Sequence, residues 1–500
     1  MSKYDYSKQI NLWLTSDSDI YQRLVLALNE KIKQELMTNG VNDHEPIKRF
    51  KIEEHEKALR YILADLFVTF SNDPKRYLAF SRNNTWYSTA TRYQPKRFSP
   101  GPFTNVVDAL TSLGYIESIK GYNDKSGNNG RISRMIATDK LIKLFKKLKI
   151  TTTDFKSDLN RESIILKTPK GSKAKTKKIN YTDTPEASLM RNNLKQINEN
   201  IGKHWIDLRI TDTQFGEIQA KLIKDNDKYK HPVDFTRTNM FRIFNNGDES
   251  NPKFNQGGRF YGGWWLSLPS EYRSRITING KKTIELDYST MHFYMMYAEK
   301  NLPIPDGDLY TVDRIDRSKA KKALNIALNA SSKTKSITAI KENHWPKKSR
   351  KEVTEILDKL LKKHEAISEF FFTGKGVELQ FKDSQIAESV MLNIWKEWGE
   401  AVLPVHDSFI IRASLIDKLK GQMNKSFKEI TGYNSKMKPK KADELLKSSL
   451  DKKAQRVDYD EDGNITGLGV NAADTYDDYK QEQKDYSGYL LRQVRWEYKE

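Results

Sequence analysis

Apolar positions in the first half of the chain recur at the spacing of amphipathic helices. Leucine and isoleucine return every three to four residues across 17–36 and again across 53–70, which predicts two helices there. A third helical pattern covers 185–201. It follows a lysine-rich stretch at 170–178 that is typical of an exposed linker.

Helical and strand-like patterns alternate in the next part of the chain. A helical stretch over 104–113 is followed by short β-type runs at 115–119 and 132–137, which a glycine- and asparagine-rich tip joins. This order resembles a winged helix-turn-helix module. Such a module would lay its helix in a DNA major groove and place Arg131 and Arg134 on phosphates. The alternative is a small structural α+β subdomain with solvated arginines.

Two aspartates end strand-like runs in the second half of the chain. Asp287 closes a β-type run and precedes an apolar helical segment, whereas residues 401–411 read as two strands around a turn with His406 and Asp407. Mg²⁺ takes oxygen ligands, so the two carboxylates and the backbone carbonyl of Tyr288 could hold two such ions. Taken alone, each aspartate is an ordinary strand-end residue.

A basic helical segment lies between these aspartates. Within 317–329, Arg317, Lys321 and Asn325 are spaced four residues apart and would form one polar stripe on a helix. Such a stripe could bind a triphosphate and neutralise the charge that develops in the transition state. Without the neighbouring aspartates, a basic helix is more often a solvated surface.

The composition narrows the class of protein. The 500 residues include 86 lysine and arginine against 66 aspartate and glutamate, a formal charge of +20, so we expect a polyanionic partner, most commonly nucleic acid. The absence of cysteine excludes disulfides and thiolate zinc sites. Since no long apolar run or signal-like N-terminus occurs, we expect a soluble cytoplasmic protein without a membrane partner.

The motifs together resemble those of a known enzyme superfamily. Residues 287–289 (Asp-Tyr-Ser) resemble motif A of the family A DNA polymerases. Residues 405–409 (Val-His-Asp-Ser-Phe) resemble motif C, in a form more similar to the phage-type single-subunit RNA polymerases. Arg317 and Lys321 match the spacing of motif B on the fingers helix.

Weaker similarities follow the order of that superfamily over 257–412. Gly258-Arg259 resembles a segment before motif A, residues 308–311 resemble the segment before the fingers helix, and Gln380 lies in a stretch similar to the palm helix before motif C. The resemblance implies an α+β fold with a right-hand polymerase palm. Its fingers would be reduced, because the interval between motifs A and C is short for the superfamily.

The resemblance also implies roles for the residues of motifs A, B and C. Asp287 and Asp407, with the Tyr288 carbonyl, would hold two Mg²⁺ ions, or Mn²⁺ in their place. Arg317 and Lys321 would bind the β- and γ-phosphates of the incoming nucleotide, and Lys321 would protonate the leaving group. Tyr288 would also contact this nucleotide.

Further nucleotide contacts are ambiguous in the sequence. Lys322 could take the place of Lys321, and neither position is followed by the usual stacking aromatics; Asn325 stands where one is expected after Lys321. Five residues after the motif A aspartate stands His292, whose bulk should exclude a ribose 2′-hydroxyl and favour deoxynucleotides. The Ser408 of motif C favours ribonucleotides instead.

The predicted function is a template-directed nucleotidyltransferase, a DNA polymerase that adds dNTPs to a primer 3′-hydroxyl without proofreading. DNA primer–template, with RNA as the alternative, would be the macromolecular partner, contacted by Arg259, Gln380 and His406. An RNA polymerase or primase, a terminal transferase, and a non-catalytic replication initiator or regulator are the alternatives. A phage or mobile-element enzyme and an antiviral defence enzyme would share these features.

The patterns divide the chain into four regions. Residues 1–150 form a mostly helical, winged-helix-like DNA-binding region, and 151–235 form a linker and a thumb-like helical region. The polymerase palm and fingers are predicted over 236–435. The charged residues 436–500 form a C-terminal extension.

Overall fold

The computed structural model describes residues 7–41, 45–83, 86–87, 91–94, 99, 101–122, 130–169, 176–224, 232–439, 457–459, 465–468 and 488–494. Parts of three predicted features lie outside these residues: the tip of the hairpin at 123–130, most of the lysine-rich linker and most of the C-terminal extension.

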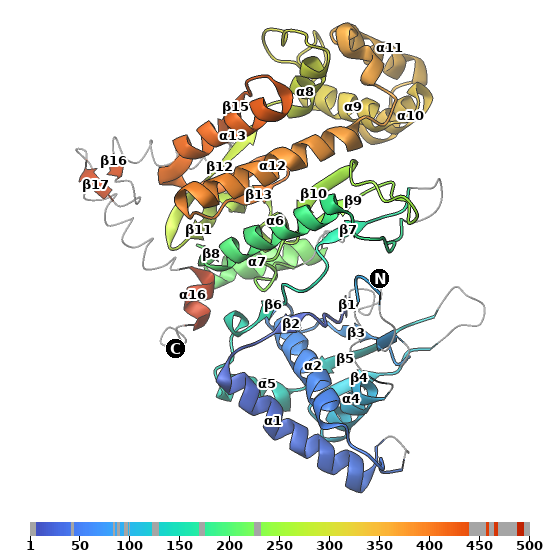
Figure 1. The fold of residues 1–500 in the computed structure, drawn as a ribbon, viewed down its shortest axis with the longest axis vertical. Coiled ribbons are helices and arrows are strands. Elements are labelled where there is room, and N and C mark those ends of the chain that lie inside the picture. The colour runs from blue at the N-terminus through green and yellow to red at the C-terminus, as the bar shows by residue number, and fades with distance from the viewer. Residues whose placement is uncertain are drawn as a thin grey trace.

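Buried side chains form two hydrophobic cores. The first runs from Ile10 to Phe155, and the second runs from Ile164 to Leu490. Figure 1 shows the corresponding two bodies, with the N-terminal unit (blue to cyan) below and the second unit (green to orange) above it. The chain passes from one core to the other close to the predicted boundary at residue 150.

The N-terminal unit packs helices against a small mixed sheet, whose strand order is β1-β3-β5-β4. The predicted helices over 17–36 and 53–70 are confirmed. The elements are α1 (Asp19–Gln34), a π-helical turn (Glu35–Asn39), α2 (Ile52–Asn72), α4 (Pro102–Ser112), α5 (Asp139–Lys147), β1 (Lys8–Gln9), β3 (Leu78–Phe80), β4 (Ile116–Ile119) and β5 (Ser133–Ala137); β2 (Leu14–Thr15) pairs with β6 (Lys156–Ser157) after a 3₁₀ turn (Thr152–Asp154).

The helix predicted to enter a DNA groove is α4, and it is part of the core. Eight of its eleven residues are buried, and only Ser112 is exposed. The ring of Phe103 stacks on that of Tyr87 with a centroid distance of 4.2 Å. The predicted groove-reading role is therefore wrong for this helix, because its apolar stripe and most of its remaining positions face protein.

The two arginines predicted on the wing, Arg131 and Arg134, differ in their surroundings; we call them the wing arginines. Arg131 is exposed, and its backbone pairs with Tyr122. Arg134 lies in β5 and is buried, and its guanidinium donates to Ser7 Oγ (2.9 Å) and to the Ile132 carbonyl (2.9 Å). The phosphate contact predicted for Arg134 is contradicted by this burial, whereas Arg131 remains accessible.

The second unit is built on a six-stranded antiparallel sheet with the order β13-β14-β12-β11-β8 and β15 beside β12. A three-stranded sheet, β10-β9-β7, and a helical layer complete it. The strands are β7 (Ile164–Leu166), β8 (Ile206–Leu208), β9 (Phe241–Phe244), β10 (Gly257–Tyr261), β11 (Ile276–Ile278), β12 (Lys281–Tyr288), β13 (Leu403–Val405), β14 (Ser408–Arg412) and β15 (Met437–Pro439), with β16 (Val457–Tyr459) and β17 (Ile465–Leu468) as a separate pair.

Long helices cover this sheet, and α12 is the central one. It packs along β10, α13 and α6 and ends where Gly399 adopts a left-handed conformation (Figure 1). The helices are α6 (Pro185–Gly202), α7 (Asp212–Lys224), α8 (Met291–Glu299), α9 (Arg317–Asn329), α10 (Lys333–His344), α11 (Arg350–Lys362), α12 (Gly376–Trp398), α13 (Ile416–Thr431) and α16 (Tyr489–Val494), with 3₁₀ turns at Trp264–Leu266, Ser270–Arg275, Glu365–Phe370 and Ala413–Leu415.

The fold class is therefore α+β, as the sequence predicted. Part of the predicted C-terminal extension belongs to the second unit, since β15 pairs with β12 and α16 packs beside β8. Across the described ranges, no helix combines the length and apolar character needed to cross a membrane.

Candidate active site

The structure brings Asp287, near the end of β12, next to Asp407, in the turn that leads into β14. β12 and β14 pair antiparallel with Asp287 opposite Ser408, the residue next to Asp407. The Tyr288 amide donates to the Asp407 carbonyl at 3.1 Å. Asp287 is buried (8% exposed) at the end of its strand, and Asp407 is half-buried in the turn between β13 and β14. Residues 120 positions apart in the sequence thus become backbone neighbours.

The turn that carries Asp407 has an unusual backbone. His406 adopts a φ of 60°, in the left-handed region that a residue with a side chain rarely occupies. Ser408 Oγ donates to the buried Glu285 carboxylate (2.6 Å) and lies 3.0 Å from the Val405 carbonyl oxygen, which ties the turn to β12. Strained residues of this kind cluster at functional sites because the surrounding contacts hold them there. His406 is exposed, with its ring 6.3 Å from that of Tyr261.

A third carboxylate lies beside the pair. Asp383 of α12 is buried and accepts from Arg259 of β10, whose Nε and Nη2 lie 2.8 and 2.6 Å from Asp383 Oδ2. Burial raises the pKa of Asp383 to about 6; the charge of Arg259 opposes this rise, and that of Asp407 adds to it. The predicted primer-contacting arginine is therefore held next to the two strand-end aspartates.

His292 of α8 completes this charged group. Its Nε2 lies 3.5 Å from Arg259 Nη2 and 4.0 Å from Asp383 Oδ2. Burial, then Arg259, lowers the pKa of His292 to about 4, with Lys321 acting in the same direction and Asp407 against it. The imidazole is therefore neutral near pH 7. Since both Lys321 and Asp407 act on this one ring, α9 and the β13–β14 turn face a common site.

Arg259 is positioned by a second arginine, Arg242, which no sequence motif indicated. Arg242 of β9 is fully buried between the rings of Phe244 and Phe260, and it donates to the Gly258 carbonyl and to Ser384 Oγ, both at 2.7 Å. A bulge in the pairing of β10 falls here. Gly258 has a φ of 78°, and a Cβ atom there would meet the Phe244 ring at 2.7 Å, so only glycine fits.

The predicted basic stripe on α9 points at an aromatic ring. The guanidinium of Arg317 lies 5.5 Å, and Lys321 Nζ 5.7 Å, from the ring centroid of Tyr310. Arg317 also donates to Asp308 Oδ2 at 2.6 and 2.8 Å. Burial raises the pKa of Tyr310, and the charges of Asp407 and Asp287 raise it further. The tyrosine therefore connects the cations of α9 with the aspartates of the sheet.

The structure separates the two candidate lysines. Lys321 lies over Tyr310, whereas Lys322 acts on the other side of the helix, where burial and then Lys322 lower the pKa of His344. Lys321 is therefore the lysine on the side of the aspartates. Asn325 follows one turn later and is half-buried, and its carbonyl accepts from Asn329 Nδ2 at 2.8 Å.

Tyr288 does not present its side chain to this site. Its ring packs beside Phe427, and its hydroxyl donates to the Met423 carbonyl of α13 at 2.6 Å, on the core side of the sheet. The prediction that this side chain contacts a nucleotide is therefore wrong. Its backbone carbonyl remains the only candidate ligand at this position.

The remaining predicted nucleic-acid contacts fall in two places. Gln380 is half-buried on α12, one turn before Asp383, so it belongs to the same region. Arg131 and Arg134 belong to the N-terminal unit, and the structure does not bring them to the aspartates.

The oxygen donors suit a hard divalent cation. Mg²⁺ is commonly bound by one or two carboxylates together with substrate phosphates, and Asp287 and Asp407 supply such a pair. The described ranges contain no group of three or more histidine, aspartate or glutamate side chains arranged to hold a metal ion. Substrate oxygens would therefore have to complete the coordination.

Two further residues could have been found from the sequence. Asp383 stands at helical spacing from the apolar residues Leu379, Ile386 and Val390 of a long helix, and burying a carboxylate on such a face requires a partner. Tyr310 lies in the short segment before the basic helix that had already been singled out. Arg242 carried no comparable signal. Comparison of the chain with protein-family models and with curated proteins gives no match.

Proposed function

We propose that this protein is a template-directed nucleotidyltransferase, a DNA polymerase that extends a primer 3′-hydroxyl with deoxynucleotides on a palm-like sheet. One observation carries the proposal. Asp287 of β12 lies next to the turn that carries Asp407, and the cations of α9 face the same site across Tyr310. Metal-binding carboxylates and triphosphate-binding cations are the two parts that phosphoryl transfer requires.

Asp287 and Asp407 are the residues that would hold two Mg²⁺ ions. When bound, these ions would polarise the primer 3′-hydroxyl and neutralise charge on the triphosphate. The 3′-hydroxyl gives up its proton to solvent water, and its oxygen forms a bond to the α-phosphorus as the bond from that phosphorus to the bridging oxygen breaks, so that pyrophosphate leaves. Lys321 donates a proton to the departing pyrophosphate from Nζ, and Arg317 binds its oxygens.

The protein also orients the primer. Arg259 is fixed by Asp383 and can direct its remaining N–H groups to the last primer phosphate. His406 projects from the turn beside Asp407 and would contact the primer terminus, and Gln380 would contact the strand next to it. The Tyr310 ring below Arg317 and Lys321 holds both cations by cation–π attraction.

The deciding experiment is primer extension with dNTPs and Mg²⁺, on primed, unprimed and template-free substrates. Asp287→Asn and Asp407→Asn are each expected to reduce the rate by about a thousandfold, the loss typical of a group that stabilises transition-state charge. Asp313→Asn removes an exposed carboxylate and should leave the rate unchanged. Extension that survives both active-site substitutions contradicts the proposal. Template-free extension assigns the protein to the terminal transferases instead.

Sugar selection provides a separate test. His292 stands beside Arg259 and near the aspartates, where its bulk would meet a ribose 2′-hydroxyl. His292→Ala is expected to raise NTP incorporation relative to dNTP incorporation on the same primed template. A wild-type enzyme that prefers NTPs would make the protein an RNA polymerase or primase.

A further inference from the structure

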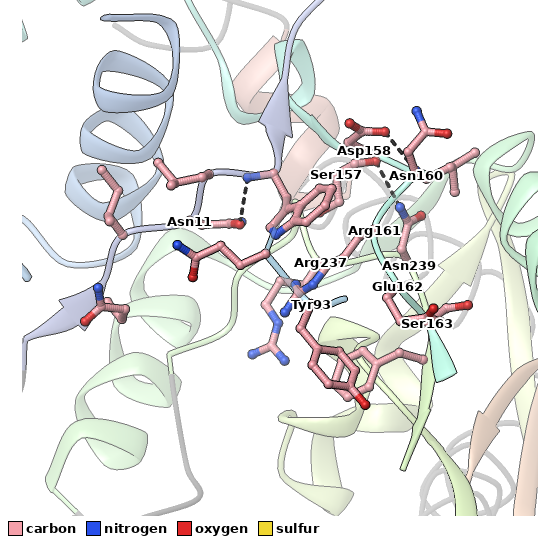
Figure 2. A pocket seen from close by; sticks show the side chains of 18 of the residues that line it. Asn11, Tyr93, Ser157, Asp158, Asn160, Arg161, Glu162, Ser163, Arg237 and Asn239 are labelled. Atoms are coloured by element: carbon pink, nitrogen blue, oxygen red, sulfur yellow. Dashed lines mark hydrogen bonds between the residues drawn. The ribbon is translucent and has the colours of Figure 1, made fainter. Parts of the chain in front are cut away.

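A large cavity lies between the two cores. Its volume is about 1150 Å³, above the roughly 300–1,000 Å³ of ordinary small-molecule pockets. The walls come from residues 7–13 and the end of α2 in the N-terminal unit, from the connection at 157–163, and from α6 and the start of β9 in the second unit. Figure 2 shows the side chains that converge on it.

The cavity wall is strongly basic. Eight arginine and lysine residues line it, against three aspartate and glutamate residues. Some of these cations are neutralised locally: Arg92 and Arg191 share Glu162 and Asp183, all within 3.1 Å, and Lys8 binds Asp65 at 2.6 Å. The excess positive charge is concentrated at the remaining cations.

Arg161 and Arg237 hold like charges close together inside the cavity. Figure 2 shows both side chains meeting at its centre. Arg161 and Lys178 are exposed at the cavity surface, and Arg237 is half-buried. Partial desolvation and then Arg237 lower the pKa of Arg161, and partial desolvation and then Arg161 lower the pKa of Lys178. Asp234 interacts with Arg237 and offsets part of its charge. A bound anion would relieve the repulsion that Arg161 experiences from Arg237 and Lys178 from Arg161. An anionic ligand would therefore gain free energy at this position.

Aromatic rings alternate with these cations. Lys178 Nζ lies 5.4 Å from the ring of Tyr93, and the guanidinium of Arg161 lies 5.9 Å from that of Phe241. Tyr93 and Phe241 are half-buried cavity residues, as are Trp13 and Trp86. Unpaired bases stack on such rings while arginine and lysine bind the phosphates between them, an arrangement that paired bases in a duplex cannot use.

The aromatic series leads from the cavity to the candidate active site. The Phe241 ring stacks with that of Tyr261 at 6.1 Å, and Tyr261 lies 6.3 Å from the ring of His406, the neighbour of Asp407. Gly262, which follows Tyr261, also lines the cavity. A strand bound in the cavity would thus continue directly to the turn that carries Asp407.

We infer that this cavity binds a single strand of nucleic acid, with Arg161 and Arg237 on its phosphates, and guides that strand to the site around Asp407. The direction of the strand rests on the proposed function. The binding itself does not, because the charge and the rings belong to the cavity.

The test is fluorescence anisotropy of a labelled twelve-nucleotide oligo(dT) with the full chain, without nucleotide triphosphates, over a range of salt concentrations. Arg161→Ala/Arg237→Ala is expected to weaken binding about tenfold and to reduce the salt slope by about 1.4, since each lost phosphate contact is worth about 0.7 on single strands. The matched control, Arg23→Ala/Lys143→Ala, removes two exposed helical cations of the N-terminal unit and should bind like the wild type.

The outcomes separate the two proposals. If Arg161→Ala/Arg237→Ala and the control variant bind the oligonucleotide equally well, the inference is overturned. It is also overturned if inorganic triphosphate displaces the oligonucleotide with the affinity typical of a nucleotide-binding pocket. Arg161→Lys/Arg237→Lys keeps the charge and should retain most of the affinity, which distinguishes lost contacts from misfolding. If Asp407→Asn leaves extension intact while the cavity variant loses binding, the proposed function fails and the cavity inference stands.

Discussion

Two buried carboxylates, one in each unit of the molecule, have different charged neighbours. In the N-terminal unit, Asp108 of α4 accepts two hydrogen bonds from Arg82, at 2.6 and 2.8 Å, within a closed pair. In the second unit, burial raises the pKa of Asp383 to about 6 although Arg259 is bound to it, and the charge of Asp407 adds to this rise. Asp108 is thus paired with an arginine, whereas Asp383 has a second carboxylate among its charged neighbours.

This difference indicates where chemistry takes place. Closed pairs satisfy buried charge and serve the fold. An arrangement that leaves carboxylates crowded next to one another has a cost in stability that only a ligand or a cation would offset, and such perturbed groups cluster at functional sites. The following four predictions test this contrast, beginning with the largest expected effect.

Breaking the closed pair should cost stability and nothing else. Asp108→Ala leaves Arg82 without its carboxylate, and we expect the free energy of unfolding to fall by about 3–4 kcal/mol, near the lower end for a broken buried pair. Urea unfolding followed by circular dichroism measures this. Asp139→Ala, at an exposed position of α5, is the control and should change stability by less than about 1 kcal/mol. A small effect of Asp108→Ala would show that the pair is not closed.

Asp383 should make stability fall as the pH rises. Its folded-state pKa of about 6 exceeds the ordinary value of 3.8, so the fold favours the protonated form. The contribution of Asp383 to the free energy of unfolding is therefore fully present below about pH 4 and is lost as the pH rises through 6. The change amounts to at most about 3 kcal/mol. Urea midpoints between pH 4 and 7 should therefore decline more in the wild type than in Asp383→Asn. Parallel curves would show that the fold does not raise the pKa of Asp383.

The two lysines of α9 should differ in their effect on catalysis. Lys321→Ala is expected to lower kcat/KM for dNTP incorporation about a hundredfold, or roughly 2.7 kcal/mol, because Lys321 lies on the side of the aspartates. Lys322→Ala removes the same charge from the other side of the helix and should change kcat/KM by less than about threefold. A larger loss of kcat/KM in Lys322→Ala than in Lys321→Ala would mean that the opposite face of α9 lies toward the site.

The wing arginines offer the smallest and finest comparison. Arg134→Ala removes the hydrogen bonds to Ser7 and the Ile132 carbonyl, so we expect a loss of about 1–2 kcal/mol in unfolding free energy. Arg131→Ala changes an exposed residue and should stay within about 0.5 kcal/mol. Thermal melts of both variants check this. If both variants lose the same unfolding free energy, the difference in exposure between Arg134 and Arg131 does not distinguish a structural arginine from a surface one.

Local pattern alone predicted much of the architecture. Helical periodicity located α1 and α2, and strand-like runs with turn residues located the hairpin that holds His406 and Asp407. Both signals arise from residues within a few positions of one another, where side-chain spacing and backbone geometry are directly linked. The strand-end positions of Asp287 and Asp407 were predictable for the same reason.

Other features depended on residues far apart in the chain. The burial of α4, the choice of Lys321 over Lys322, and the contact of Asp383 with Arg259, 124 positions away, cannot be read from any local window. An amphipathic stripe shows that a helix has an apolar face, but not how many neighbours cover its other faces.

The sequence by itself therefore determined which segments form helices and strands and which residue types stand at their ends. Only the tertiary structure decided which of these residues share a site. The cavity with Arg161 and Arg237 forms where one core meets the other, so it exists in neither segment alone. The physical reason is that burial and electrostatic interaction are properties of distance in space, which the packing of the two cores sets.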